Sequence, residues 1–303
     1  MTPTRRDFLT TSAAAAATLG ALATTHAADP PATAPAKRPL KKGLMFSMYQ
    51  GGGSLTDKFK ALKEAGFDGV ELDAPGRFKP DDVRAACAAS GLEVEGVVDA
   101  FHWNVTLSDP DPRKRALAVE TLKNAIRECK AFGGTSVLLV PAVVSKRVSY
   151  ADAYARSQEE IRKALPVAQE TGVKIAIENV WNHFLLSPLE AARYVDEFQS
   201  PLVGWHFDIG NVVTFGWPEH WVQILGKRIL KLHIKEYSRA KRDKEGPYKG
   251  FDVELLEGDN DWPTIMKALD AIGYTGWGSA EVRGGGPDRM KDIAQRMDRI
   301  WAC

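Results

Sequence analysis

Short apolar runs alternate with amphipathic stretches eight times along this chain, and this alternation constrains the fold more than any other feature. The runs are rich in β-branched and aromatic residues, which is typical of buried strands. They cover residues 43–49, 68–75, 93–103, 135–143, 174–180, 203–211, 229–237 and 276–284. The stretches between them have helical spacing, as in residues 54–67, where Ser54 is the expected N-cap.

Eight strand–helix units in one domain of this length predict an α/β fold, the (β/α)8 TIM barrel. A doubly wound sheet fits less well, because no GxGxxG sequence or phosphate loop follows the first run. Pro166 predicts a kink or an early break in the helix over residues 150–172. Residues 238–261 form a long polar loop, expected on the C-terminal rim of the barrel as a lid or a plain insertion.

The N-terminal residues lie outside the predicted fold. Arg5 and Arg6 are followed by a Phe-Leu pair and an Ala-rich stretch that ends in small residues at Ala27. This pattern resembles a twin-arginine export signal, which is removed on maturation. We therefore expect a signal peptide at 1–27, a Pro/Ala-rich tether at 28–41 and the barrel at 42–303. The predicted location is periplasmic, or otherwise exported by the twin-arginine route.

Charge and composition exclude several classes of partner. Loss of residues 1–27 removes Arg5, Arg6 and Asp7 from a chain of net charge +1, so basic and acidic residues become equal in number. A neutral surface argues against nucleic acid, because phosphate binding needs a basic footprint. The three cysteines form no CxxC and give neither a zinc knuckle nor a disulfide framework. No integral membrane segment is expected in the mature form, because no later apolar run is long enough.

Four of the runs carry one metal-competent side chain near the C-terminal end, namely Glu178, Asp208, His233 and Glu281. In a TIM barrel these ends meet at one face, and a lone buried carboxylate is costly. We therefore predict that the four side chains converge on one divalent cation. Three carboxylates and one imidazole favour Mn²⁺, Mg²⁺ or Co²⁺ over a structural zinc site, with Zn²⁺ as a further alternative.

The segments GVELDAP, IENVWNHFLLSPLE, FDIGN, HIKEY and SAEV make residues 43–301 similar to the xylose isomerase-like TIM-barrel superfamily, the sugar phosphate isomerase/epimerase group. The resemblance implies that the four side chains above bind one divalent ion, and that Glu178 and Glu281 act as paired acid and base. Some family epimerases place a second Glu six residues after the first and a His three after the Asp. Phe184 and Asn211 stand at those positions here, so 3-epimerisation of a free ketose does not carry over.

Isomerising a hydroxy-ketone requires removal of a proton beside a carbonyl, and this leaves an enediolate whose charge a metal stabilises. We therefore expect a metal-dependent sugar isomerase/epimerase. The export signal and the neutral surface favour an unphosphorylated keto-sugar, while Gly284-Gly285-Gly286, as a backbone phosphate nest, would favour a sugar phosphate.

Other functions compete with this interpretation. A lyase or hydratase acting on 3-keto-glycosides would use the same metal and base, and the motifs do not separate it from an isomerase. A non-catalytic sugar-binding protein would not need paired glutamates around a metal. A DNA-repair endonuclease of the same superfamily would need more His ligands and a basic groove. The sequence leaves a homo-oligomer open.

A further set of residues falls near the predicted strand ends and could contact substrate. It comprises Lys235, His102, His183, Glu71, Arg283, Trp103 and Trp181. Lys235 points the same way as His233, two residues earlier on a strand. Glu71 and Arg283 are expected at the rim, where they bind substrate or pair with each other. The tryptophans suit stacking on sugar faces.

Overall fold

Eight parallel strands form the barrel wall in the computed structural model, which describes residues 38–303. The strands are β1 (Leu40–Leu44), β2 (Gly69–Ala74), β3 (Glu93–Asp99), β4 (Ser136–Leu139), β5 (Lys174–Glu178), β6 (Val203–Asp208), β7 (Ile229–Ile234) and β8 (Gly276–Ala280). From β2 to β8 each strand pairs with the next one in sequence, and β1 pairs with β8. The seam between β1 and β2 carries the single bridge Met45–Glu71, so the barrel is nearly closed. The predicted (β/α)8 TIM barrel is confirmed.

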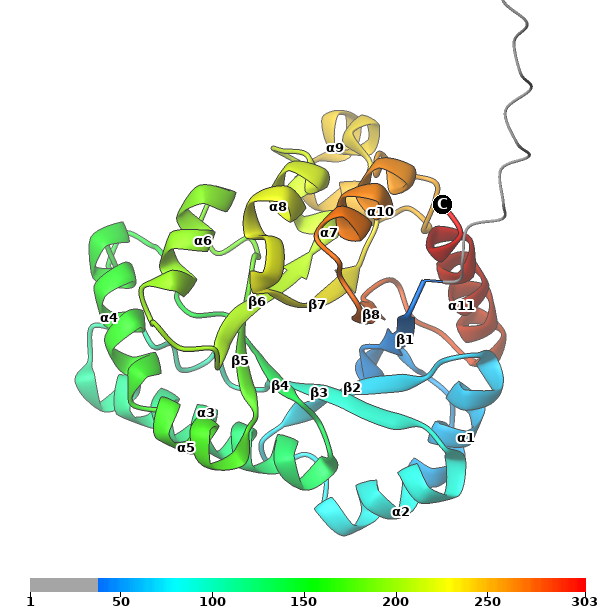
Figure 1. Cartoon of the computed structure of the whole chain (residues 1–303), viewed down its shortest axis with the longest axis horizontal. Coiled ribbons are helices and arrows are strands. Elements are labelled where there is room, and N and C mark those ends of the chain that lie inside the picture. Colours follow the sequence, from blue (N-terminus) through cyan, green and yellow to red (C-terminus); the bar gives the residue numbers. More distant parts are fainter. Residues whose placement is uncertain (1–37) are drawn as a thin grey trace, which may run out of the picture. The chain divides into compact units, whose positions relative to one another are not determined.

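The helices surround the ring of strands, as Figure 1 shows. They are α1 (Leu55–Ala65), α2 (Pro80–Ser90), α3 (Pro112–Phe132), α4 (Tyr150–Arg162), α5 (Leu165–Thr171), α6 (Pro188–Asp196), α7 (Ile209–Val213), α8 (Pro218–Leu225), α9 (Arg239–Glu245), α10 (Trp262–Ala271) and α11 (Pro287–Trp301). Within the described residues, no helix combines the length and the apolar character that crossing a membrane requires.

Local capping explains where several helices begin and end. The Ser54 hydroxyl accepts from the Asp57 N–H, and the Asp57 carboxylate accepts from the Ser54 N–H, which confirms the predicted start of α1. Gly66 ends α1 with φ of 104°, a backbone conformation that favours glycine. The chain breaks between α4 and α5, and Pro166 lies in the first turn of α5, as the sequence predicts.

The structure differs from the sequence prediction in two places. Strand β1 begins at Leu40, because Leu40 and Lys41 pair with β8, so these two residues belong to the barrel and not to the predicted tether. The predicted signal peptide and the rest of the tether lie outside the described residues, apart from Arg38 and Pro39. The loop at 238–261 contains α9 and the 3-10 helix η3 (Pro247–Phe251), which its polar composition did not reveal.

The interior of the barrel holds charged groups as well as the usual aliphatic core. Lys231 of β7 donates to the main-chain oxygen of Glu95 of β3, and its Nζ lies 3.7 Å from Glu95 Oε2. Glycines provide the space, because a Cβ at Gly43 would lie 1.9 Å from Glu95 Oε1 and one at Gly96 would lie 2.7 Å from Lys231 Nζ. The Lys231 ammonium group offsets part of the cost of burying the Glu95 carboxylate.

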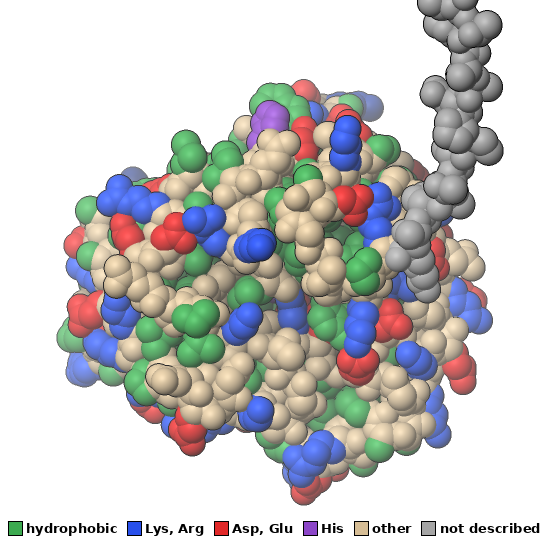
Figure 2. All heavy atoms as spheres, in the orientation of Figure 1, with side chains coloured by type: hydrophobic (Ala, Val, Ile, Leu, Met, Phe, Trp, Pro, Cys, Tyr) green, Lys and Arg blue, Asp and Glu red, His purple; other side chains and the backbone are tan. Residues whose placement is uncertain are grey.

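Charged side chains on the surface are mixed in sign. On the face that Figure 2 shows, basic and acidic side chains alternate with apolar ones, and no broad patch of one sign covers it. This distribution agrees with the near-zero net charge of the sequence. A surface of this kind does not offer a nucleic-acid backbone a basic track on that face.

Candidate metal centre and active site

Glu178, Asp208, His233 and Glu281 converge at the C-terminal end of the barrel, as the sequence predicts. Each offers one ligand atom, and these atoms all lie within 4.8 Å of one another. The His233 Nδ1 is 3.2 Å from Glu178 Oε1, 3.1 Å from Glu281 Oε2 and 3.9 Å from Asp208 Oδ2. The first three residues are buried, whereas the Glu281 side chain is 24% exposed. The cluster therefore opens toward solvent on the side of Glu281.

Two neighbouring amides hold Asp208 in place. Asp208 ends β6 and caps α7, with its Oδ1 accepting from the Asn211 N–H at 2.8 Å. The Asn179 side chain donates to the Asp208 main-chain oxygen at 2.7 Å and accepts from the Asp208 N–H at 3.0 Å. The Asp208 Oδ2 is thereby left to face the cluster. Sequence reasoning missed Asn179, although its place directly after Glu178 was a usable signal.

Lys235 lies in contact with the cluster itself. Its Nζ donates to Glu281 Oε2 at 2.8 Å and to Asp208 Oδ2 at 3.1 Å, and it lies 3.4 Å from Asn211 Oδ1. The ammonium group offsets part of the negative charge of three carboxylates in a buried setting. The sequence prediction that Lys235 and His233 point the same way agrees with this position.

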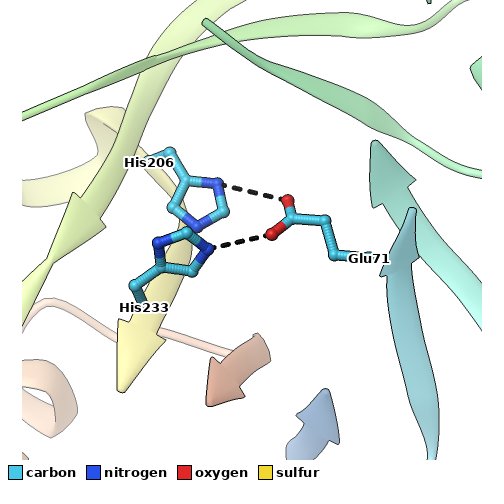
Figure 3. Close-up of side chains that lie close together, drawn as sticks. All are labelled: Glu71, His206 and His233. Carbon is cyan, nitrogen blue, oxygen red and sulfur yellow. Dashed lines mark hydrogen bonds and ion pairs between the residues drawn. The ribbon is translucent and has the colours of Figure 1, made fainter. Parts of the chain in front are cut away.

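Glu71 holds the other side of the His233 ring, as Figure 3 shows. The Glu71 Oε2 lies 2.9 Å from His233 Nε2, and its Oε1 lies 3.8 Å from His206 Nδ1. Glu71 and His206 are 1% and 0% exposed, so both are buried inside the barrel. Among the described residues Glu71 pairs with these two histidines and forms no ion pair with Arg283, and its contact with substrate stays a prediction. Sequence pattern identifies the strand but not the depth of a side chain in the barrel.

The Glu71 contact determines how His233 can act. A carboxylate beside Nε2 favours the proton on that nitrogen and leaves the Nδ1 lone pair for the cluster. Metal-binding histidines in proteins are commonly oriented by such a carboxylate. The two histidine rings also pack edge to face, with centroids 4.1 Å apart. Neither nitrogen of His206 has a hydrogen-bond partner among the described residues, and Glu71 Oε1 lies 3.8 Å from its Nδ1.

Burial and charge shift the pKa values of the cluster in different directions. Burial raises the pKa of Glu178, and it raises the pKa of Asp208 to about 7. Burial acts the same way on Glu281, but Lys235 and His233 more than offset it and hold the pKa of Glu281 well below its usual value. Burial lowers the pKa of His233, but the surrounding glutamates more than offset it and raise the pKa well above the usual value.

His102 and Trp103 lie in the turn after β3. The His102 Nδ1 accepts from the Val140 N–H at 3.2 Å, which places the ring proton on Nε2, and burial lowers its pKa to about 3. His102 is thus a neutral donor at physiological pH, while Trp103 is 49% exposed. The nearby Asp99, which sequence reasoning missed, ends β3, and burial raises its pKa to about 7.

Two cavities flank the cluster, each with a volume of about 350 Å³. The first, the polar cavity, is lined by Lys235, Glu281, Arg283, Met48 and Phe251 among others. The second, the apolar cavity, is lined chiefly by Trp181, Phe184, Leu186, Phe215, Trp221 and Tyr248. Of the predicted substrate residues, Lys235 and Arg283 therefore lie on one side, and Trp181 and His183 lie on the other.

The donor set fits a divalent cation. Three carboxylates and one imidazole nitrogen face one another across distances that a single ion could bridge. The orienting contact from Glu71 supplies the outer support that metal-binding imidazoles usually have. The residues that would hold the ion are the four that the sequence identifies.

Curated relatives match part or most of the chain. An uncharacterised protein of Methanocaldococcus jannaschii is 25% identical over 234 residues, which is 74% of this chain and 77% of that protein. The 2-epi-5-epi-valiolone 7-phosphate 2-epimerase of an Actinoplanes species is 25% identical over 154 residues, 51% of this chain and 53% of that enzyme. This chain therefore aligns with about half the length of the second relative.

Solved structures share the fold. The 3-keto-D-glucoside 4-epimerase of E. coli superposes with a TM-score of 0.72 at 18% identity, covering 88% of this chain and all of that one. The D-allulose 3-epimerase of a Methylomonas species gives 0.70 at 19% identity, covering 87% and 96%. Residues 59–301 match the family described as xylose isomerase-like TIM barrel. The chain therefore belongs to the xylose isomerase-like TIM-barrel family.

Proposed function

We propose that this protein is a divalent-metal-dependent sugar isomerase or epimerase that moves a proton on the carbon beside a carbonyl. The observation that carries the proposal is the convergence of four ligand atoms from successive strands, two of them from glutamates on either side of His233 Nδ1. The epimerase names of the Actinoplanes relative and of two similar structures support the same reaction class.

The chain's own residues would divide the work. Glu178 and Glu281 would remove and return the proton, since a carboxylate that can reach the proton on the substrate carbon can serve as base and then as acid. When bound, the divalent ion would supply positive charge to the two adjacent oxygens of the substrate and so stabilise an enediolate. Lys235 borders the polar cavity and would orient a substrate oxygen there.

We further propose an unphosphorylated substrate. The name of the Actinoplanes relative gives a 7-phosphate as its substrate, and the glycine run at 284–286 is the feature of this sequence that would bind one. The Gly285 N–H donates to the Met48 main-chain oxygen at 3.0 Å, and its own oxygen accepts from Gln50. A Cβ at Gly284 would lie 1.9 Å from that Met48 oxygen. These contacts support a structural role for Gly284 and Gly285 rather than a phosphate nest.

The proposed location rests on the N-terminal sequence alone. Arg5, Arg6 and the Ala-rich stretch favour export by the twin-arginine route, which carries folded proteins with their metal. Changing both arginines to lysine should leave the precursor in the cytoplasm. Unchanged export of that variant would contradict the proposal.

Solvent-deuterium uptake tests the proposed reaction. The metal-loaded protein should introduce deuterium from D₂O at the carbon beside the ketone of an unphosphorylated keto-sugar, read by NMR. Glu281→Gln should keep part of the metal but lose the uptake, because an amide cannot accept the proton. Analysis of the products separates the 3-keto-glycoside lyase or hydratase, which would also release or add a group. The substrate assignment would be contradicted if deuterium uptake were at least about tenfold faster with sugar phosphates than with unphosphorylated keto-sugars. That factor equals about 1.4 kcal/mol in transition-state free energy.

A further inference from the structure

The apolar cavity beside the cluster has no counterpart in the proton-transfer chemistry proposed above. None of its lining residues is Asp, Glu, Lys or Arg, and aromatic rings and leucines form most of its wall. Three of these, Leu186, Phe215 and Tyr248, are 55%, 54% and 72% exposed. Large apolar side chains left open around a hollow generally mark a binding site.

One end of this cavity lies beside residues that contact the metal cluster. Asn179 and Asn211 line it, and these residues hold Asp208 through the hydrogen bonds described above. The Asn211 Oδ1 lies 3.4 Å from Lys235 Nζ, which in turn lies 2.8 Å from Glu281 Oε2. One amide side chain thus separates the apolar cavity from the groups that would hold the sugar.

The cavity wall is held in shape by its own contacts. The Trp181 indole N–H donates to the Asn211 main-chain oxygen at 2.9 Å, and its ring packs against Phe251 with centroids 5.0 Å apart. His183 and Leu185 adopt φ of 59° and 54°, unusual for residues other than glycine. Such a conformation persists only where the surroundings impose it, so this loop is built to a fixed shape.

We infer that the apolar cavity is the aglycone subsite of a keto-glycoside substrate, and that it takes an aromatic or similarly apolar aglycone. This inference rests on the proposed function and names its substrate class. The sugar ring lies in the polar cavity at the cluster, and the aglycone passes over the Trp181–Phe251 contact. A volume of about 350 Å³ accommodates one or two aromatic rings. The absence of Lys and Arg from this wall disfavours a phosphate at the same position.

Two positions where the sequence differs from some related epimerases also belong to the apolar cavity. Phe184 and Asn211, which stand where some related epimerases have a second Glu and a His, both line this cavity. An apolar ring and a neutral amide in place of two ionisable groups suit an uncharged, apolar part of a substrate. Both departures thus lie in the wall of this cavity.

The test compares phenyl and methyl 3-keto-D-glucosides by solvent-deuterium uptake with metal-loaded protein. We expect kcat/KM at least about tenfold higher for the phenyl compound, equivalent to about 1.4 kcal/mol. The double variant Leu186→Ala/Phe215→Ala should reduce this preference to near unity. Leu189→Ala, 70% exposed but not part of the cavity wall, should behave as the unmodified protein. Equal rates for both compounds, or a preference untouched by the double variant, would overturn the inference.

A binding measurement separates failure of the subsite from failure of the proposed reaction. Trp181 and Trp221 line the cavity, so phenyl D-glucoside should change the tryptophan fluorescence, and methyl D-glucoside should not. If neither keto-glucoside takes up deuterium, the proposed reaction fails. The subsite then stands if phenyl D-glucoside binds and the double variant loses that binding. It falls if the two glucosides bind alike or not at all.

Discussion

The ammonium group of Lys235 lies 2.8 Å from Oε2 of Glu281, the same carboxylate oxygen that lies 3.1 Å from Nδ1 of His233. One oxygen therefore faces both a fixed cation and the imidazole that completes the candidate metal site. Lys235 stabilises the carboxylates before an ion binds, and it repels the ion afterwards.

Lys235→Met should accordingly have opposite effects on the two states. The metal-free protein should lose about 3 kcal/mol of stability, because the buried Asp208 and the partly buried Glu281 lose their charged partner. Metal affinity should rise about tenfold or more, since a like charge is removed from the site. Thermal unfolding with and without Mn²⁺ measures both effects, with the exposed Lys60→Met as control. A smaller metal-induced rise in Tm than in the unmodified protein would contradict this account.

Glu71 should act on the metal through His233. Glu71→Leu removes the acceptor beside Nε2 and should weaken metal binding about 10- to 100-fold. Glu71→Gln keeps an oxygen that can accept the N–H, so its loss should be smaller. Competition with a chelator gives the affinities, and Glu93→Gln on the outside of β3 is the matched control. Equal losses for the leucine and glutamine variants would argue against a role in fixing the tautomer.

Metal affinity should increase with pH. The pKa of His233 is raised well above its usual value in the metal-free protein, so the ring carries a proton that must leave before Nδ1 can bind an ion. The pKa of Asp208 is raised to about 7, which adds a second proton to displace below neutral pH. Each released proton corresponds to about a tenfold gain in affinity per pH unit while the group titrates. Chelator competition between pH 6 and 8 measures how metal affinity changes with pH. An affinity that stays constant or falls as the pH rises would contradict the prediction.

The segment after β7 should depend on Glu236. Its carboxylate accepts from the Leu256 N–H and the Trp262 indole N–H, both at 2.8 Å, and from the Asn260 N–H at 3.2 Å. Glu236→Ala leaves these donors without a partner and should cost about 3 kcal/mol. Urea unfolding should show the loss, and limited proteolysis should cut within residues 239–259. The exposed Glu245→Ala serves as control, and unchanged proteolysis of the Glu236 variant would indicate that other contacts hold the segment.

Further contacts hold the long loop against the barrel. Arg239 donates to the main-chain oxygens of Val213 and Gly216, at 3.0 and 2.8 Å, and the Tyr237 hydroxyl donates to that of Pro247 at 2.8 Å. The polar sequence predicts a surface loop. It does not show that the buried Glu236 binds the C-terminal part of that loop through hydrogen bonds. These hydrogen bonds hold the segment against the barrel in the described structure.

The sequence predicted the ligand set because the rule that governs it is local. Glu178, Asp208, His233 and Glu281 each stand at the end of an apolar run, and parallel strand ends meet at one face of a barrel. The role of Glu71 could not be predicted in this way. It depends on the depth of the side chain in the barrel and on contacts with β6 and β7, which the alternation along one strand does not specify.

The apolar cavity shows the same limit. Trp181 and His183 were identified from their place after a strand, but their neighbours Phe215 and Tyr248 come from segments far along the chain. These rings come together only in the folded protein, so no local sequence pattern predicts the cavity. The sequence shows that Phe184 and Asn211 differ from the residues of some related epimerases. It does not show that both line the same cavity.

The metal content of the purified protein tests the central claim most directly. Mass spectrometry of the elements, after loading with Mn²⁺ and desalting, should find one divalent ion per chain. The double variant Asp208→Ala/His233→Ala should bind none and retain the circular dichroism spectrum of a folded barrel. Stoichiometric metal in that folded variant would show that the ion, and the proton transfer proposed to depend on it, belong to a different site.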